Sequence, residues 1–130
     1  MQSNDEDFAE PDADMITAQG KFKAPRTSTS ALTMKLLRSR GFTCCNVEHY
    51  NVFAGIRNDL FGCIDIAAVK PGELLLVQTT SWSNVSSRRR KIQGIPAAGW
   101  LSELPQVKVV IMGWRKVGAR WQYKEEEYHV

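Results

Sequence analysis

Asp65 stands near the start of an apolar run that has the length of a buried strand, Ile64–Val69. A second apolar run, Leu74–Thr80, follows after Lys70-Pro71-Gly72-Glu73, in which proline and glycine favour a tight turn. Near-continuous apolar runs of this length are typical of strands that are covered on both faces. A carboxylate in such a strand costs several kcal/mol unless it is paired or binds a metal ion. Asp65 is therefore the first candidate for chemistry.

The second run ends in three polar residues, Gln78, Thr79 and Thr80. In an antiparallel hairpin the start of one strand lies beside the end of the other. Asp65 and these three residues are thus expected to converge at one edge of the sheet. The two strands therefore predict a single polar site, to which neighbouring segments can add further groups.

Glu48 is a second acidic candidate. It falls at the end of an expected strand, residues 42–48, where a neighbouring strand could bring it near Asp65. A surface glutamate at a strand end is the alternative. His49 has a weaker case, because a lone histidine beside a strand end is usually solvated or hydrogen-bonded. The chain has two histidines, too few for a histidine-rich metal centre.

The segment 50–60 is expected to be a loop over the site. It contains Arg57 and Asp59, which fit a loop next to a phosphate or a metal ion, although a structural turn explains them equally well. Asp59 is the second choice for the acid that we assign to Asp65. Asp65 is preferred because the strand begins there.

A basic run follows the second strand and consists of four consecutive cations, Arg88, Arg89, Arg90 and Lys91. It lies in a predicted short helix, 85–92, for which Ser83 or Asn84 can supply the N-cap. Four consecutive side chains point to all sides of a helical turn, so they do not decorate one solvated face. A basic first turn beside a polar strand edge favours phosphate binding, and a plain basic surface helix is the alternative.

Hydrophobic periodicity and turn signals predict the elements that position these residues. An amphipathic helix, 31–40, begins after serine and threonine caps and stops at Gly41. Further elements are expected at 42–48, 64–69 and 74–80 (strands), 85–92 (helix), 97–104 (a helical turn or two), 107–114 (strand) and 120–128 (edge strand). The order α-β-β-β-α-β-β predicts an α/β fold with a mixed central sheet flanked by helices and a C-terminal edge hairpin.

Charge divides the chain into two parts. Residues 1–26 are expected to be an acidic, flexible N-terminal arm, and residues 27–130 a single α/β domain. Residues 1–14 hold six acids and no base, so the other eight acids and all 17 bases give residues 15–130 a net charge of +9. A basic body favours a polyanion partner, and a solubility tail on a mildly basic domain is the alternative. A sharper hypothesis is that the acidic segment occupies the basic groove as a phosphate mimic.

Composition argues against several other classes of protein. No apolar run approaches the ~20 residues of a membrane span, and the acidic N-terminus is unlike a secretory signal. Three cysteines without C-x-x-C spacing favour reduced thiols over a disulfide framework or a zinc site. We therefore expect a cytoplasmic protein with no membrane partner.

Two motifs resemble those of the PD-(D/E)xK nuclease superfamily, and within it the Holliday-junction-resolvase and virus-type replication-repair nuclease branches. Phe61-Gly62-Cys63-Ile64-Asp65-Ile66-Ala67 looks like the aspartate motif, and Val77-Gln78-Thr79-Thr80 stands where Glu-x-Lys is expected. The resemblance covers residues 27–114 and implies a restriction-endonuclease-like α-β-β-β-α-β core. In the second motif Gln78 replaces the acid and Thr80 replaces the lysine.

The resemblance implies hydrolysis of DNA phosphodiester bonds, those of branched DNA included, with Mg²⁺ or Mn²⁺ as cofactor. Asp65 would be the bridging carboxylate and Glu48 the second one. The amide oxygen of Gln78 and the carbonyl oxygen of Thr79 would be further ligands. A neutral amide in place of a carboxylate weakens the binding of a hard cation, unless Glu48 or Asp59 joins the site.

The resemblance also bears on the basic residues. Thr80 cannot act as an ammonium group, so Lys91 is the first candidate for the missing cation and Lys35 the second. Arg57 and the basic run Arg88–Lys91 would bind the DNA. Related resolvases work as dimers, which makes a homodimer the expected assembly.

Two other functions remain open. A nuclease-like fold that has lost catalysis, and binds DNA or RNA through the basic run, would also lack the acid and the lysine of the second motif. A structural or interaction module, for example of a phage or mobile element, would carry the basic run incidentally. Metal-dependent cleavage separates the first two functions, and salt-dependent nucleic-acid binding separates both from the third.

Overall fold

The computed structural model describes residues 7–9, 28–51 and 55–130; for residues 7–9, 49–51, 56 and 57 it describes the backbone alone. Most of the expected N-terminal arm, 1–26, therefore lies outside the described residues. The exception is a short strand, Asp7–Ala9, which pairs with the last strand of the chain. None of the described helices is long and apolar enough to cross a membrane.

The expected helices and strands are present. The helices are α1 (Thr29–Ser39), the 3₁₀ turn η1 (Trp82–Asn84), α2 (Val85–Gln93) and α3 (Pro96–Ser102). The strands are β1 (Asp7–Ala9), β2 (Thr43–Asn46), β3 (His49–Asn51), β4 (Ile56–Asn58), β5 (Ile66–Lys70), β6 (Glu73–Ser81), β7 (Val107–Val117) and β8 (Arg120–Tyr128). The strands β3 and β4 are an addition, because the sequence predicts a loop there.

The main sheet has six strands in the order β1-β8-β7-β6-β5-β2, and β3 pairs with β4 in a separate sheet. In the main sheet β6 and β7 run parallel, and the other described neighbours are antiparallel. A helical crossover of η1, α2 and α3 joins the parallel pair. These findings confirm an α/β fold with a mixed sheet. The C-terminal hairpin β7–β8 is not at the edge of the sheet, because β1 pairs with the outer side of β8.

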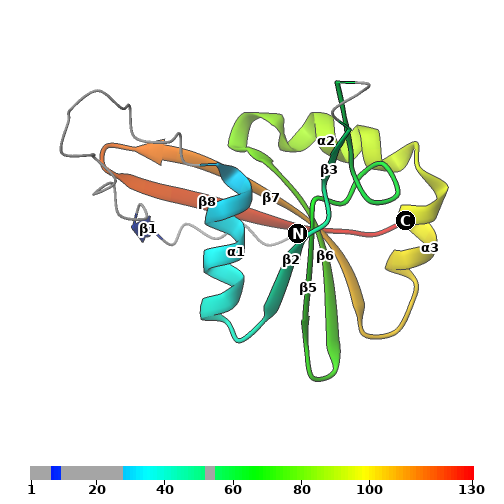
Figure 1. The fold of residues 1–130 in the computed structure, drawn as a ribbon. Coiled ribbons are helices and arrows are strands. Elements are labelled where there is room, and N and C mark those ends of the chain that lie inside the picture. The colour runs from blue at the N-terminus through cyan, green and yellow to red at the C-terminus, as the bar shows by residue number, and fades with distance from the viewer. Residues whose placement is uncertain (1–6, 10–27, 52–54) are drawn as a thin grey trace.

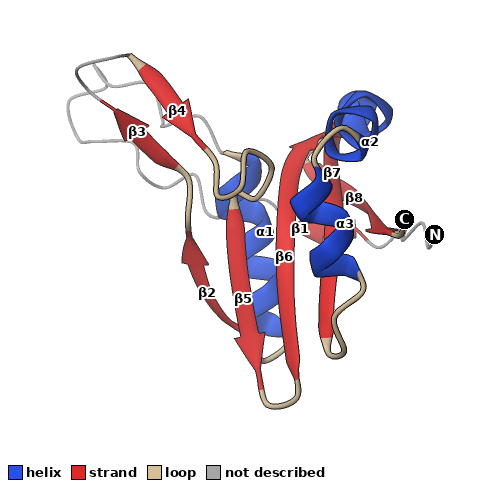
Figure 2. Cartoon of the chain, turned by 90° about the vertical axis from the view of Figure 1, so that its right-hand side faces the viewer, coloured by secondary structure: helices blue, strands red, loops and turns tan. Residues whose placement is uncertain are grey.

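Helices cover both faces of the sheet: α1 lies on one face, and α2 and α3 lie on the other (Figures 1 and 2). The core under α1 contains Leu32, Leu37, Ile66, Val77, Met112 and Trp114. The core under α2 and α3 contains Ile64, Leu76, Val85, Ile92, Val109 and Ile111. The central strands are thus covered on both faces, as their continuous apolar sequences predict.

Local signals fix the ends of the elements next to the site. Ser28 caps α1, and its hydroxyl oxygen accepts a hydrogen bond from the Ala31 N–H at 3.0 Å. Gly72 has a φ of +81°, which lets Pro71-Gly72 make the two-residue turn between β5 and β6. The cap sets the start of α1, and the turn sets the register of β5 on β6.

A buried hydroxyl network ties α1 to the centre of the sheet. The Thr33 hydroxyl donates to the Thr29 carbonyl at 2.8 Å and accepts from the Trp114 indole N–H at 2.9 Å. Because Thr33 has a single hydroxyl proton, Thr79 is the donor in the 3.0 Å contact between the Thr33 and Thr79 hydroxyls. The network therefore fixes Thr79, which neighbours Gln78 in β6.

The substitution Thr33→Val is expected to lower the free energy of unfolding by about 2–4 kcal/mol. Valine keeps the volume but takes the acceptor away from the buried groups of Trp114 and Thr79. Thermal unfolding measures the effect. Thr43→Val is the matched control, because Thr43 is exposed on β2, and should stay within about 0.5 kcal/mol of wild type. Equal stability of the two variants would contradict the role of the network.

Candidate metal centre

Asp65 immediately precedes β5, and its backbone forms hydrogen bonds with the two segments that flank it. Its N–H donates to the Val77 carbonyl at 2.8 Å, and its own carbonyl accepts from the Val47 N–H at 2.9 Å. The residue is 3% exposed. The antiparallel pairing of β5 with β6 thus places Asp65 beside the end of β6, where the sequence predicts a polar site.

One carboxylate oxygen of Asp65, Oδ2, accepts two hydrogen bonds from the end of β6. Gln78 Nε2 donates to it at 2.7 Å, and the Thr79 N–H donates to it at 3.0 Å. The N–H and C=O of one strand residue point to the same side, so the Thr79 carbonyl is directed toward β5 as well. The structure thus brings together Asp65, Gln78 and Thr79, three of the residues that the sequence singles out.

The carboxylates of Glu48 and Asp59 join that of Asp65 in an acidic triad. One oxygen of each carboxylate lies within 4.8 Å of the other two, and the cluster could hold a metal ion. Asp65 is buried, and Glu48 and Asp59 are half-buried. The hairpin β3–β4 explains how they meet: His49 pairs with Asn58, so Glu48 and Asp59 are the residues just outside that pair.

Burial and mutual repulsion in the acidic triad make the charged form of its buried carboxylate, Asp65, less favourable. Burial raises the pKa of Asp65 to about 7, which the hydrogen bond from the Thr79 N–H partly opposes. The carboxylates of Asp59 and Glu48 contribute to this increase. Around neutral pH the triad therefore retains a proton for part of the time. A cation among the three carboxylates would take the place of that proton.

Gln78 adds an unsatisfied polar atom to this site. Its Oε1 is buried and has no hydrogen-bond partner among the described residues, whereas its Nε2 is bound to Asp65. Leaving a buried acceptor unsatisfied costs about 1–3 kcal/mol, and an amide oxygen is a ligand that hard cations accept. The three carboxylates and this oxygen form a donor set that fits a divalent cation.

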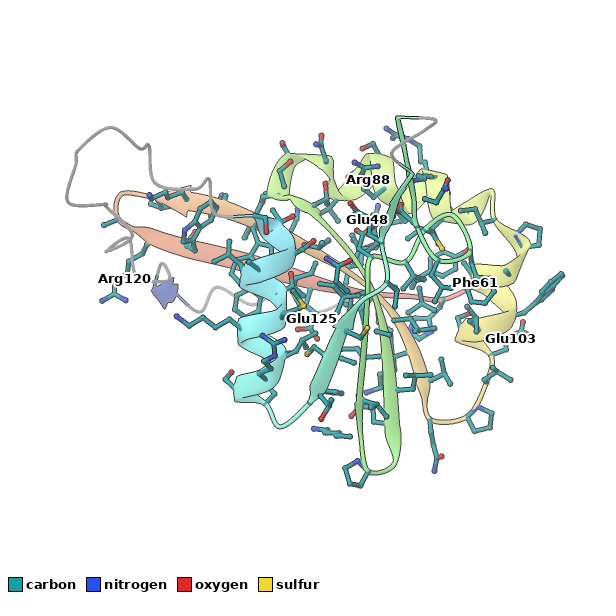
Figure 3. The ribbon with its side chains drawn as sticks, in the orientation of Figure 1. Glu48, Phe61, Arg88, Glu103, Arg120 and Glu125 are labelled. Atoms are coloured by element: carbon teal, nitrogen blue, oxygen red, sulfur yellow. The ribbon has the colours of Figure 1, made fainter. Side chains whose placement is uncertain are left out.

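A polar pocket of about 310 Å³ opens over the triad. Its other walls include the start of α1, with Ser28, Thr29 and Ser30, and the Arg88 side chain from α2. Figure 3 shows Glu48 and Arg88 close together at this end of the sheet. The pocket therefore places a positive charge and the first residues of α1 next to a cluster of carboxylates.

The four cations of the basic run have different surroundings. Arg88 lines the pocket, and Lys91 Nζ lies 3.7 Å from Asp59 Oδ2. Arg90 is exposed. Arg89 is directed elsewhere, because its guanidinium donates to both carboxylate oxygens of Glu126 on β8. Of these cations, Arg88 thus lines the pocket, Lys91 pairs with an acid of the triad, and Arg89 instead ties α2 to the sheet.

The remaining predicted residues contribute less to the pocket. Thr80 is buried and lies two residues along β6 from Gln78, on the same face of the strand. Lys35 is exposed on α1 and is not among the residues that line the pocket. The side chains of His49 and Arg57 lie outside the described residues.

Two features of the site escape the sequence prediction. The strands β3 and β4 pair with each other where the sequence predicts a loop, and Gly55, with a φ of +65°, is the signal in the sequence that could have indicated a turn. Because of the hairpin, the carboxylate of Asp59, the second choice in the sequence, lies next to that of Asp65. The residues 28–30, expected only to cap α1, also line the pocket.

Comparison of the chain with protein-family models, with curated proteins and with solved structures finds no match. The chemistry of the pocket therefore has to be inferred from its own side chains. Three carboxylates and an amide oxygen suit a divalent cation, and the adjacent basic side chains suit an anionic ligand.

Proposed function

We propose that the protein is a metal-dependent endonuclease that hydrolyses phosphodiester bonds in DNA, branched DNA included. The observation that carries the proposal is a pocket that is lined by the acidic triad and by Arg88, with Lys91 paired to Asp59 of the triad at 3.7 Å. Carboxylates hold a divalent cation and basic side chains hold a phosphate, and hydrolysis of a phosphodiester by this route needs both.

The order of elements supports a restriction-endonuclease-like core. The elements α1, β2, β5, β6, α2 and β7 follow the order α-β-β-β-α-β, with the hairpin β3–β4 inserted between β2 and β5. Asp65 precedes β5, and Gln78 lies near the end of β6. These are the places of the two motifs in the nuclease superfamily that the sequence resembles, so the topology supports the same proposal.

The acidic triad and Gln78 Oε1 would hold the cation, for which we propose Mg²⁺ or Mn²⁺. When bound, the cation lowers the pKa of a coordinated water and neutralises charge on the phosphate. The protein's own contribution is to fix the carboxylate of Asp65. The Gln78 amide and the Thr79 N–H both bind its Oδ2 atom, and Thr79 is in turn held by Thr33.

Arg88 and Lys91 supply the positive charge for the phosphate. The guanidinium of Arg88 lines the pocket and can bind two phosphate oxygens at once. Lys91 is beside Asp59, so its ammonium can hold a phosphate oxygen or the attacking group near the triad. It provides the positive charge that Thr80, in the lysine position of the second motif, cannot provide.

A cleavage assay tests the proposal. Four-way-junction, nicked and linear DNA are incubated with the protein and with Mg²⁺, Mn²⁺ or a chelator. Cleavage that requires the metal ion is the expected result. Salt-dependent binding without cleavage would point to the second function, a nuclease-like binding module, which the threonine at position 80 favours. The absence of both binding and cleavage would contradict either assignment.

Lys91→Gln is expected to lower the rate of metal-dependent cleavage by about 10²–10³-fold, because a preorganised charge beside the reacting phosphate is lost. Single-turnover rates with saturating metal ion measure the effect. Arg90→Gln is the matched control, since Arg90 is an exposed neighbour on α2 that carries the same charge. Equal rates for the two variants would show that Lys91 is not the missing cation.

A further inference from the structure

A second group of cations lies on the hairpin β7–β8, around the ring of Trp82. The Arg115 guanidinium is 3.9 Å from the centre of this ring, and Lys124 Nζ is 4.9 Å from it. Trp82 begins η1, the segment that crosses over β7. The crossing is close: a Cβ atom at Gly113 of β7 would overlap Val85 and lie 3.2 Å from Trp82 Cα. Glycine at that position lets η1 carry Trp82 onto the hairpin.

Strand register places these cations on one face of the hairpin. Arg115 pairs with Gln122, and its Nε donates to the Gln122 side chain at 2.9 Å. Lys124 and Arg120 are each two residues from Gln122 along β8, so both share its face. Trp82, Arg115, Arg120 and Lys124 therefore form one surface, which we call the hairpin surface.

The hairpin surface carries positive charge without acidic partners. Its cations are Arg115, Arg120 and Lys124, and residues 115–124 include no acid. Among the described residues no carboxylate pairs with Arg115 or Lys124, and the neighbouring acids of β8 are engaged elsewhere, Glu125 with Arg40 and Glu126 with Arg89. Two cations that share one aromatic ring repel each other, and an anion placed between them would relieve that repulsion.

The acidic N-terminal segment gives a second indication. Its described part, β1, pairs with β8 directly beside the hairpin surface, with Ala9 opposite Arg120. Residues 1–14, from which β1 comes, hold six acids. The described part of this acidic segment thus lies at the edge of the basic hairpin, as is expected of a surface that attracts negative charge.

We propose that the hairpin surface binds the sugar–phosphate backbone of duplex DNA next to the phosphate that is held at the acidic triad. Thr80 lies near the end of β6, the strand that carries Gln78 and Thr79. Trp82 follows Thr80 by two residues, which span at most roughly 7 Å of chain. A strand of DNA that enters the pocket can therefore reach both places. Arginine and lysine side chains are common ligands of the phosphate oxygens of the DNA backbone. This inference depends on the proposed function, which it extends to a longer DNA footprint.

The experiment measures DNA binding against salt for the full-length protein. The probe is a labelled linear duplex of about 25 base pairs in chelator, which prevents cleavage, at about 50–200 mM salt. The double variant Arg115→Gln/Lys124→Gln is expected to bind at least about tenfold more weakly and to reduce the slope of log K against log[salt] by nearly 2. Arg120→Gln, an exposed single variant, should reduce the slope by about 1.

The matched control is Arg38→Gln/Lys108→Gln, which removes two exposed cations from α1 and from the other end of β7. It should leave the slope unchanged, and thermal unfolding checks that all variants fold.

Equal slopes for wild type and both hairpin variants, or an equal loss of slope in the control, would overturn the inference while the proposed function stands. Competition by a polyglutamate peptide as strong as that by DNA of equal charge would assign the surface to acidic protein segments instead. Absence of any salt-dependent binding by the wild type would contradict the proposed function itself.

Discussion

Replacement of Asp65 by asparagine is expected to abolish metal-dependent cleavage and, in the same variant, to stabilise the metal-free protein. Asp65 is 3% exposed and its carboxylate lies near two others, so its charge opposes folding until a cation is bound. Asparagine keeps the size of the side chain and an oxygen for the Thr79 N–H. The cleavage rate should fall by at least about 10³-fold, and the melting temperature at pH 8 should rise by about 5 °C.

The pH dependence of stability follows from the same residue. The folded protein raises the pKa of Asp65 to about 7, above its ordinary value of 3.8. Between these two values the folded state holds a proton that the unfolded state has released. The free energy of unfolding of the metal-free protein should therefore fall as the pH rises from about 4 to about 7, and this contribution should stay constant at higher pH.

Thermal unfolding of the wild type and Asp65→Asn between pH 4 and pH 8, with and without Mg²⁺, measures both effects. The variant should lose most of the decline with pH and most of the increase in melting temperature that Mg²⁺ gives the wild type. Glu103→Gln is the matched control, because it removes one exposed acid that lies outside the pocket. A metal-free Asp65→Asn protein that is less stable than wild type at pH 8 would refute this account of the triad.

Gln78→Glu is expected to have effects opposite to those of Asp65→Asn: it should lower the stability of the metal-free protein and raise its affinity for Mg²⁺. A glutamate cannot donate the 2.7 Å hydrogen bond that Gln78 Nε2 gives to Asp65, and it adds a fourth carboxylate to the cluster. The metal-free protein should lose about 2–4 kcal/mol of stability at pH 8. The affinity for Mg²⁺ should rise by at least about tenfold, because the charge of the donor set controls the binding of a hard cation.

Isothermal titration with Mg²⁺ and thermal unfolding without it test this pair of effects. Gln93→Glu adds the same charge at an exposed position of α2 that is not part of the pocket, and both quantities should stay near wild type in that variant. If Gln78→Glu left the Mg²⁺ affinity unchanged, the side chain of Gln78 would not be a ligand. The triad alone would then have to account for any metal binding.

The parts of the site that depend on local pairing could be predicted from the sequence. The turn Pro71-Gly72 and the apolar runs on either side of it are enough to bring Asp65 to the end of β6. The helical crossover to a parallel strand was also predictable, because the basic helix and its glycine and proline breaks lie between two apolar strands. These predictions depend on residues that are close in the chain.

The rest of the site depends on contacts that sequence patterns do not report. Asp59 meets Glu48 only because strands in the segment between them pair as a hairpin, and that segment carries little hydrophobic alternation. The Arg89–Glu126 pair joins α2 to β8, which is distant in the sequence. The run of four cations alone therefore does not indicate which of them has a structural partner. The pairing of β1 with β8 is non-local in the same way.

The hairpin β3–β4 projects from the main sheet, as Figure 2 shows, and the residues at its two ends, Glu48 and Asp59, are two members of the triad. When the two ends of the hairpin come together, Glu48 and Asp59 are therefore brought into the triad at the same time. Thermodynamic linkage then applies: any ligand that holds the two ends of the hairpin together increases the affinity of the triad for its cation. By reciprocity the cation increases the affinity for that ligand by the same factor.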